Sequence, residues 1–382
     1  MKLTCSRCVY NEDTPGISFD DTGICNYCHT HDELCRQYPA GEEGHAHIMR
    51  MVDEMRKAGK GKKYDCIVGF SGGCDSSYLL HIAKKIMGLR PLAVHFDNGW
   101  NSKISEENIQ AIIEKLDIDL YTYAVDTQEY DDIYRSFFKS AVPDIEAPTD
   151  IALAATLNNA AEKFGVKYIL EGHNFRTEGI SPLGWLYMDG KYVTSVHKQF
   201  GTIPLATYPT MSLAEMIRWM VIRGIRKLRP LWYMDYDKED VKQFLQETYG
   251  WQWYGGHHLE NRFTAFYHSY FMLQRYGMDG RLLGYAAQVR NGKMPREEAL
   301  RLLQAPPLLE SDLIEYLTTR LGFTEEEFSQ YMTQPQKSFQ DYPNYKKTFE
   351  TLRPFFWLMA KMGRIPMSFY MKYTKKMPQK NT

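Results

Sequence analysis

The stretch that decides the fold is Tyr64-Asp65-Cys66-Ile67-Val68-Gly69-Phe70-Ser71-Gly72-Gly73-Cys74-Asp75-Ser76-Ser77. Its first half is an apolar run of strand length, and apolar residues at helical spacing follow it as far as Met87. A Ser/Gly-rich turn therefore joins a buried strand to the start of a helix. The glycines allow a tight turn and a close backbone approach, and the helix N-terminus favours phosphate. The sequence predicts an anion site at this turn.

The turn lacks the lysine of the Walker loop and resembles the S-G-G-x-D-S loop of the ATP pyrophosphatase (PP-loop) superfamily. Members of that superfamily, such as GMP synthetase and the tRNA thiolation enzymes, cleave ATP between its α and β phosphates. The resemblance implies that Asp75 helps to place Mg²⁺, that Ser71 and Asp75 are catalytic, and that the loop cradles pyrophosphate through Ser71, Gly72, Gly73, Asp75, Ser76 and Ser77. An ordinary glycine-rich βα turn is the alternative. A nucleophilic Cys74 is disfavoured, because the loop chemistry needs no thiol.

Strands and helices alternate through the first half of the chain. Strands are predicted over 64–70, 91–97, 120–125 and 166–171, and helices over 75–87, 104–116, 128–140 and 149–164. This alternation predicts an α/β fold with a doubly wound parallel sheet, whose ligands bind at the carboxyl ends of the strands. Two of the strand ends carry further polar residues. We expect Asp97 to contact adenosine or substrate. Asn174, as a catalytic residue, and Glu178 are expected to contact phosphates or Mg²⁺. Each of these residues is equally compatible with a turn or cap.

Four of the seven cysteines form the pattern C-x2-C-x16-C-x2-C. This spacing is typical of a four-thiolate zinc site, with the ligands Cys5, Cys8, Cys25 and Cys28. All four tetrahedral positions would be filled, so the metal would be structural. An iron–sulfur cluster or redox-active cysteine pairs are the alternatives.

The sequence divides into three predicted regions. These are a zinc ribbon at 1–40, a PP-loop domain with a substrate or lid insertion at 41–235, and a mainly helical substrate or partner domain at 236–382. The insertion, 175–230, is expected to be irregular. Its candidates for neutralising a diphosphate are Lys191, His197 and Lys198, with a solvated surface hairpin as the alternative. In the third region, 251–264 is expected to present a nucleotide-sugar site through His257, His258, Glu260 and Arg262. Metal binding there is disfavoured because adjacent histidines point apart.

Composition excludes several function classes. A formal net charge of −1 argues against a dedicated nucleic-acid binder. No apolar run reaches the length of a membrane span; the best candidate, 216–225, contains Arg218 and Arg223. No apolar stretch follows Lys2 as in a signal peptide, so a cytoplasmic location is expected. The basic tail, 372–380, is expected to be a solvated end or partner arm rather than a membrane anchor.

Several stretches together resemble the N-acetyl sugar amidotransferase family of surface-polysaccharide pathways: the cysteine pairs, the loop at 71–77, and residues 94–102, 254–264 and 292–300. The resemblance implies conversion of an acetamido group to an acetamidino group. Its substrate would be a nucleotide-linked (UDP-) N-acetyl sugar or a nonulosonic acid precursor, in LPS O-antigen or other surface-polysaccharide biosynthesis. ATP, Mg²⁺ and structural Zn²⁺ are implied as cofactors. Ammonia would come from a separate glutaminase of the imidazole glycerol phosphate synthase type, with a cyclase-like barrel subunit in some systems.

The chain itself shows no glutaminase module, because none of its cysteines lies in a G-x-C-x-G elbow. A tRNA sulfur-transfer enzyme of the same superfamily is the alternative function. Such enzymes usually need a basic surface and a reactive cysteine pair beyond the loop, and no cysteine follows Cys74 here. A non-catalytic nucleotide-binding module is disfavoured by the intact Ser71, Asp75 and Ser76.

Overall fold

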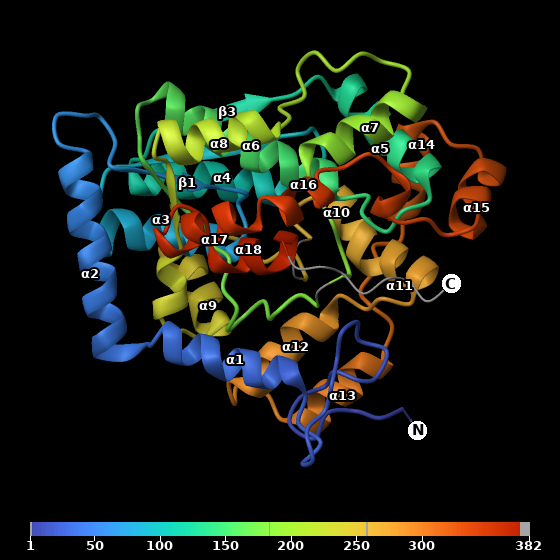
Figure 1. The fold of residues 1–382 in the computed structure, drawn as a ribbon, viewed down its shortest axis with the longest axis horizontal. Helices are drawn as coiled ribbons and strands as arrows, with labels where there is room; N and C mark the ends of the chain where they lie inside the picture. Colours follow the sequence, from blue (N-terminus) through green and yellow to red (C-terminus); the bar gives the residue numbers. More distant parts are fainter. Residues whose placement is uncertain (1, 183, 257–258, 375–382) are drawn as a thin grey trace.

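A single five-stranded parallel sheet organises the protein in the computed structural model, which describes residues 2–182, 184–256 and 259–374 (Figure 1). The strand order is β3-β2-β1-β4-β5, with bounds β1 Cys66–Gly69, β2 Pro91–Asp97, β3 Leu120–Ala124, β4 Tyr168–Leu170 and β5 Arg226–Leu228. The chain winds outward from β1 to β3 and then crosses to β4 and β5. The order therefore reverses between β1 and β4, which is where ligands bind in such sheets. The predicted doubly wound class is confirmed.

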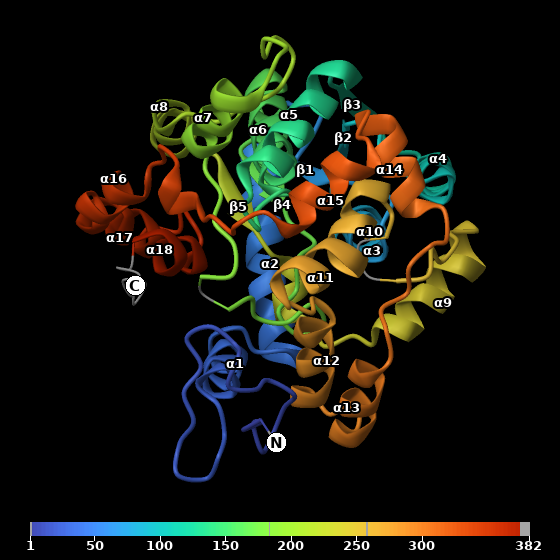
Figure 2. The same cartoon turned by 90° about the vertical axis from the view of Figure 1, so that its right-hand side faces the viewer.

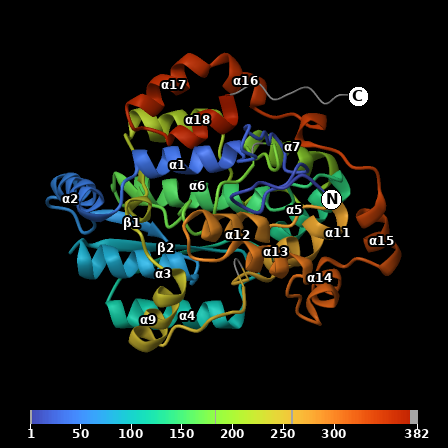
Figure 3. The ribbon, with the colours of Figure 1, turned by 90° about the horizontal axis from the view of Figure 1, so that it is seen from below.

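Helices cover both faces of this sheet. One face carries α2 (Gly41–Ala58), α3 (Cys74–His81), α4 (Lys103–Leu116) and α9 (Lys238–Tyr249), whose buried side chains pack on Val68. The other face carries α6 (Ala147–Lys163), whose alanines pack on Ile67 and Ile169. Figure 3 shows α3, α4 and α9 on one side of β1 and β2, and α6 on the other. Burial on both faces explains why β1 and the first four residues of β2 carry no charged side chain.

The predicted helices of the first half are all present. The helix after the loop runs through α3 into a π-helical turn, Ile82–Ile86, and Gly88 follows it at φ +58°. The helix predicted over 128–140 is α5 (Thr127–Ser140), and the Asp126 side chain caps it by accepting from the Glu129 N–H. Local patterns thus give these boundaries to within two residues.

The expectation that 175–230 is an irregular insertion is wrong in part. It contains α7 (Gly190–Phe200), α8 (Leu213–Ile217) with a π turn at Arg218–Ile222, and the fifth strand, β5. This strand escaped prediction because it is a short edge strand made of Arg226, Lys227 and Leu228. Its cations pair with carboxylates, Arg226 with Glu54 and Lys227 with Glu171, so no apolar pattern marks it.

The C-terminal region is mainly helical, as predicted (Figure 2). Its helices are α10 Arg262–Phe266, α11 Met272–Tyr276, α12 Arg281–Arg290, α13 Arg296–Gln304, α14 Leu313–Leu321, α15 Glu325–Thr333, α16 Lys346–Thr351, α17 Arg353–Lys361 and α18 Met367–Thr374. A π turn at Tyr267–Phe271 joins α10 to α11, and 3-10 turns lie at Pro230–Tyr233 and Phe339–Asp341. An aromatic core joins this region to α5, in which Tyr134 stacks on Phe263.

The N-terminal residues and α1 (Asn26–Gln37) pack on α12 and α13, more than 250 residues downstream in sequence (Figure 1). Buried Tyr10 and Tyr27 share a core with Ala286 and Ala299. The predicted zinc ribbon is therefore packed against the C-terminal region.

Candidate functional site

The Ser71–Ser77 loop lies at the reversal point of the sheet, between the end of β1 and the start of α3. Gly72 has φ +77°, and a Cβ there would lie 2.7 Å from the Ser105 carbonyl oxygen. Only glycine fits this position without strain. The close approach of α4 explains why the loop needs a glycine at its centre.

Side chains from outside the loop hold its carbonyl groups. Ser105 Oγ donates to the Ser71 carbonyl at 2.9 Å, and Trp251 Nε1 donates to the Gly72 carbonyl at 2.9 Å. Asn108 lies beside Trp251, where its Nδ2 donates to the Gln252 carbonyl at 2.9 Å. The Ser71 and Gly72 carbonyl groups are thereby turned away from the start of α3. The backbone N–H groups of the loop are left to face the start of this helix.

Those N–H groups have only long hydrogen bonds to hydroxyls. The Gly73 N–H donates to Ser71 Oγ at 3.3 Å, and the Cys74 N–H to the Tyr254 hydroxyl at 3.3 Å. The Ser71 N–H donates to Ser76 Oγ at 3.4 Å. A phosphate oxygen would replace these weak neutral acceptors with a charged one at the positive end of α3. The predicted loop residues therefore fit a pyrophosphate.

Asp75 is held by two side chains from the start of α9 and the residues before it. Lys238 Nζ lies 2.8 Å from Oδ2, and the Tyr236 hydroxyl donates to Oδ1 at 2.8 Å. Burial raises the pKa of Asp75. Burial alone would lower the pKa of Lys238, but the nearby carboxylates of Asp75 and Glu178 outweigh it and raise that pKa. Both Asp75 oxygens are hydrogen-bonded, and Lys238 is the counter-ion of the carboxylate. The predicted magnesium role of Asp75 stays a prediction.

The end of β4 meets the loop, as predicted. A Cβ on Gly172 would lie 3.4 Å from the Ser76 nitrogen, so the two strand ends are in contact. Asn174 is fully buried; its Oδ1 accepts from the Arg176 N–H at 3.0 Å, and it interacts with Tyr236. The predicted residues Asp75 and Asn174 are thus brought to opposite sides of the Tyr236 hydroxyl. Glu178 hydrogen-bonds His173 at the same strand end.

Asp97 forms a turn at the end of β2. Its Oδ1 accepts from the Gly99 N–H at 2.8 Å, and the neighbouring Asn98 accepts from Asn261 Nδ2 at 3.0 Å. An isolated bridge between Asn101 and Asn261 adds a second tie. The residues after β2 therefore anchor the C-terminal region; the predicted adenosine contact of Asp97 stays a prediction.

Described residues of 251–256 and 259–262 contact the loop. The Glu260 carboxylate approaches Ser71 Oγ at 3.4 Å, and its backbone carbonyl accepts from the Ser102 N–H at 2.9 Å. Arg262 points elsewhere: its guanidinium pairs with Asp312 at 2.8 Å and lies over the Tyr316 ring. His257 and His258 lie outside the described residues. Of the predicted substrate residues, only Glu260 is seen at the loop.

The candidates on α7 are not seen at the loop. His197 is buried, bonds the Ile203 carbonyl at 2.7 Å, and lies among core residues of α5. The predicted role of His197 in neutralising a diphosphate is therefore not supported by its position. Lys198 is exposed and Lys191 lies over the Tyr345 ring, so among the described residues neither lysine is found in contact with the loop.

The four predicted zinc ligands come together in one buried cluster. Their sulfurs all lie within 4.8 Å of one another. Three of the Sγ–Sγ distances are 3.8 Å (Cys5–Cys28), 3.7 Å (Cys8–Cys25) and 3.6 Å (Cys25–Cys28). A tetrahedral zinc ion with Zn–S bonds of about 2.3 Å places its sulfurs about 3.8 Å apart. The four thiols therefore fit a closed, structural zinc site.

Arginines from α12 and α13 complete this centre. Arg290 Nε lies 3.4 Å from Cys28 Sγ, and its Nη2 lies 3.3 Å from Cys8 Sγ. Arg296 donates to the Cys5 carbonyl at 2.8 Å. A buried guanidinium offsets the negative charge of four zinc-bound thiolates. No sequence pattern pointed to Arg290, because it lies far along the chain.

The remaining cysteines are poor nucleophiles. Burial raises the pKa of Cys74 to about 12 and raises the pKa of Cys66 as well. Burial also raises the pKa of Cys35, although Arg176 beside it opposes the shift. The expectation that Cys74 is not a nucleophile agrees with its surroundings.

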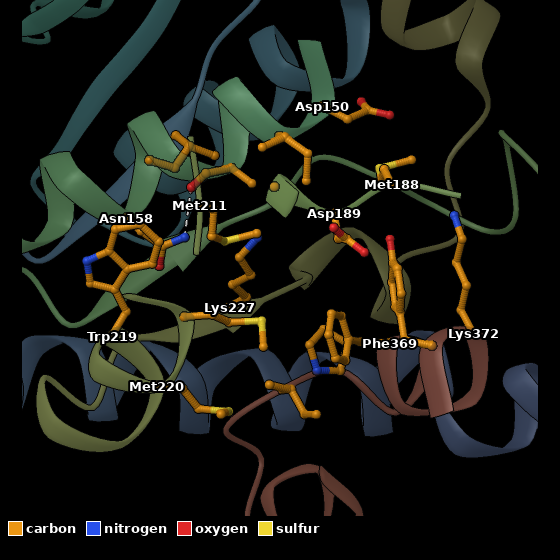
Figure 4. A pocket seen from close by; sticks show the side chains of 18 of the residues that line it. Asp150, Asn158, Met188, Asp189, Met211, Trp219, Met220, Lys227, Phe369 and Lys372 are labelled. Carbon is orange, nitrogen blue, oxygen red and sulfur yellow. Dashed lines mark hydrogen bonds between the residues drawn. The ribbon is translucent and has the colours of Figure 1, made fainter. Parts of the chain in front are cut away.

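A cavity of about 530 Å³ lies on the α6 side of the sheet, next to the ends of β4 and β5 (Figure 4). Figure 4 shows Lys227 entering between Met211 and the ring of Phe369, with Trp219 at one end and Lys372 at the other. The positive charge of Lys227 on β5 is neutralised beside this cavity by a carboxylate. Glu171 bonds Lys227 at 2.7 Å and Arg229 at 2.9 Å; burial opposes its ionisation, but the two cations hold its pKa at about 2.

His173 lines this cavity and also bonds Glu178, which faces Lys238. The cavity and the loop thus lie on the two sides of the β4 end. The cavity walls are largely apolar, so the loop remains the candidate site for a charged nucleotide.

Fold and site define a class: a doubly wound parallel sheet with a Ser-Gly-Gly-x-Asp-Ser loop at its reversal point, as in the ATP pyrophosphatase superfamily. Sequence comparison agrees. Residues 260–354 match the family described as "LPS biosynthesis protein WbpG-like, C-terminal domain". The chain therefore joins a WbpG-like C-terminal region to a doubly wound sheet domain, and the predicted resemblance to a surface-polysaccharide family is confirmed.

Curated relatives match parts of the chain. They include uncharacterized protein MJ1599 of Methanocaldococcus jannaschii, 29% identical over 45% of this chain and 59% of that protein. The tRNA-specific 2-thiouridylase MnmA of Colwellia psychrerythraea is 32% identical over 29% of this chain and 33% of the enzyme. The chain thus spans about a third to three fifths of the length of these relatives.

Among solved structures, NMN synthetase from Francisella tularensis matches with 14% identity and a TM-score of 0.31, covering 75% of this chain and 95% of that one. A predicted tRNA methyltransferase subunit from Methanocaldococcus jannaschii matches with 15% identity and a TM-score of 0.28, covering 48% and 74%. The fold is defined here by its own strand order.

Proposed function

We propose that the protein is an ATP-dependent amidotransferase of surface-polysaccharide biosynthesis. It would convert the acetamido group of a nucleotide-linked N-acetyl sugar, or of a nonulosonic acid precursor, to an acetamidino group. The observation that carries this proposal is the contact between Glu260 and Ser71. Glu260 is the first residue of the WbpG-like region, and Ser71 opens the phosphate loop. The region characteristic of lipopolysaccharide biosynthesis therefore delivers a carboxylate to the nucleotide site.

The chemistry begins with an unreactive amide. Its oxygen attacks the α-phosphate of ATP; the new O–P bond forms as the bond to the β-phosphate breaks, and pyrophosphate leaves. The N–H groups of Gly73 and Cys74 and the dipole of α3 stabilise the charge that builds up on the leaving group. Bound Mg²⁺ would supply further charge neutralisation. Asp75 is the residue that would help to place it.

The second step needs ammonia. Neutral ammonia adds to the carbon of the O-adenylyl imidate, AMP leaves with the former amide oxygen, and loss of a proton gives the amidine. Water must be excluded, because it would return the imidate to the amide. Trp251 and Tyr254 are placed to do this, because their side chains hydrogen-bond the backbone of the loop. A partner glutaminase of the imidazole glycerol phosphate synthase type, possibly with a cyclase-like barrel subunit, would supply the ammonia.

The test is mass spectrometry of candidate UDP-N-acetyl sugars incubated with the protein, ATP, Mg²⁺ and ammonium. The expected product is lighter than the substrate by one mass unit, because oxygen becomes NH, and AMP appears in equal amount. Unchanged sugars across the panel of UDP-N-acetyl sugars and nonulosonic acid precursors, with the protein folded and ATP bound, would reject the proposal.

Sulfur transfer to tRNA is the second candidate, because several relatives are tRNA thiouridylases. The thiols of this chain argue against it. Cys66 and Cys74 are buried with raised pKa, and the four N-terminal cysteines occupy the metal centre. AMP formation that depends on tRNA and a sulfur donor, and not on a sugar, would favour this candidate.

A further inference from the structure

Two stretches of the chain carry many cations and no acidic residue. Between Glu215 and Asp235 there are five Lys or Arg residues and no Asp or Glu. After Glu350, the sequence as far as Thr382 has seven Lys or Arg residues and no Asp or Glu. The whole chain has a net charge of −1, so these stretches depart sharply from its average. The cations are Arg218, Arg223, Arg226, Lys227, Arg229, Arg353, Lys361, Arg364, Lys372, Lys375, Lys376 and Lys380.

The described parts of these stretches touch one another. Arg364 Nη1 donates to the Gly224 carbonyl at 3.4 Å, and Arg226 Nε donates to the Gly363 carbonyl at 3.4 Å. Figure 2 shows α16, α17 and α18 at one edge of the molecule. The end of α17 and the turn after α8 therefore form one continuous basic surface.

Large apolar side chains are exposed on this same surface. Val221 is 48% exposed and Ile222 73% in the turn after α8; on α17 and just after it, Trp357 is 47%, Leu358 48% and Met362 54% exposed. These five are half of the large apolar side chains exposed in the described part of the chain. Such a concentration of exposed apolar area marks an interaction site.

The positive charge of this surface is only partly neutralised. Glu162 pairs with Arg218 and Arg223, Glu54 pairs with Arg226, and Glu171 pairs with Lys227 and Arg229. Two cations of α17 contact neutral groups: Arg353 bonds the Tyr370 hydroxyl, and Lys361 lies over the Trp357 ring. Among the described residues, neither of these two cations forms an ion pair.

We propose that this surface binds an anionic phospholipid bilayer in the plane of the interface. Trp357, Leu358, Met362 and Ile222 would enter the headgroup region, while the cations around them contact lipid phosphates. Tryptophan with aliphatic side chains, ringed by Lys and Arg, is the composition that favours interfacial attachment. None of the described helices is long and apolar enough to cross a bilayer, so the attachment is peripheral. The proposal is independent of the reaction proposed above, because it needs neither ATP nor sugar.

The test is co-sedimentation of the full chain with phosphatidylcholine vesicles, with and without phosphatidylglycerol. The bound fraction should rise at least about tenfold with the anionic lipid and fall in high salt. A Trp357→Ser/Leu358→Ser variant, and separately Lys361→Glu, should lose most of this binding. The matched controls are Ile86→Ser and Lys85→Glu, because Ile86 is 66% exposed and Lys85 is also exposed but neither belongs to this surface.

Thermal melting of each variant establishes that it is folded. Binding that is equal on neutral and anionic vesicles, or that survives in the folded Trp357→Ser/Leu358→Ser variant, would overturn the proposal. So would an absence of vesicle binding combined with capture of an acidic protein through these residues.

Discussion

The ammonium group of Lys238 lies 2.8 Å from the Asp75 carboxylate, joining the first residue of α9 to the phosphate-binding loop. The Lys238 side chain is 21% exposed and that of Asp75 11%. Removing one partner from such a pair leaves a largely desolvated charge. The start of α9 therefore holds the position of the loop aspartate as well as its charge.

Replacing Lys238 with Met should abolish pyrophosphate release from ATP and lower the free energy of unfolding by about 3 kcal/mol. The Asp75→Asn/Lys238→Met double variant should lose less stability than the two single variants summed, because it leaves no unpaired charge. Denaturant unfolding and pyrophosphate assays measure both effects. Glu239→Gln, whose side chain is 78% exposed, is the matched control. Additive losses in the double variant would show that the pair is not coupled.

Replacing Trp251 with Phe should weaken ATP binding while the chain stays folded. The change removes the hydrogen bond from the indole to the Gly72 carbonyl and keeps most of the aromatic area. A loss of about 1 kcal/mol corresponds to roughly a fivefold rise in Kd, measurable by calorimetry with ATP. Trp253→Phe serves as the control, since that ring lies over Lys242 and beside Trp251 and Tyr254 but makes no hydrogen bond to the loop among the described residues. Equal effects of the two substitutions would contradict the anchoring role of Trp251.

Metal analysis should find one zinc per chain, and a Cys25→Ser/Cys28→Ser variant should lose it. An Arg290→Met variant should keep the metal but lose about 2 kcal/mol of stability, because two charge-assisted contacts to thiolates are removed. Mass spectrometric metal analysis and thermal unfolding separate these outcomes, with exposed Arg301→Met as the control. Iron in place of zinc would refute the assignment of the metal.

Nitrogen delivery follows from the proposed function. The isolated protein should form AMP in the presence of sugar and ammonium at high pH, where neutral ammonia is plentiful. It should not use glutamine until a glutaminase subunit is added, and binding should then couple the two active sites. AMP assays with each nitrogen source decide this. Efficient use of glutamine by the chain alone would exclude a separate ammonia source.

Stability should depend on pH through Asp144, whose pKa burial raises to about 7. The native state then holds a proton that the unfolded state releases, so the free energy of unfolding falls as pH rises from about 4 to about 7, by roughly 4 kcal/mol at most. Asp144→Asn should remove this fall and be more stable than the parent at pH 8. Denaturant unfolding from pH 5 to 8 checks it, with exposed Asp21→Asn as the control. Parallel curves for parent and Asp144→Asn would contradict the assignment.

Local sequence patterns predicted the elements that a local pattern can specify. The apolar run before Ser71 and the glycines of the loop gave β1, the turn and α3, and the cysteine spacing gave the metal centre. The residues that complete both sites could not be found in this way. Tyr236 and Lys238 reach Asp75 across 161 and 163 positions, and only tertiary packing brings them there. Neither residue stands in a periodic pattern.

The same limit explains the two largest misses. Strand β5 is an edge strand whose Arg226 and Lys227 are neutralised by distant carboxylates, so its sequence resembles a surface loop. His197 looked like a phosphate ligand beside Lys198, but its ring nitrogens bond the Ile203 carbonyl and Ser136 in the core. In both cases tertiary packing supplies a partner that is distant in sequence, Glu54 for Arg226 and Ser136 for His197.

The contacts of Arg290 with Cys28 and Cys8 span 262 and 282 positions of sequence. During synthesis the four cysteines emerge well before α12, and they can take up metal while that helix has not yet been made. Their buried guanidinium partner is translated 262 residues after Cys28. The early metal-bound segment must therefore wait, partly uncovered, for α12 and α13 to close over it. A nascent chain truncated before α12 would hold its metal loosely and expose the apolar surface of the cluster, which makes that stage of biogenesis the one most open to chaperones and to oxidation.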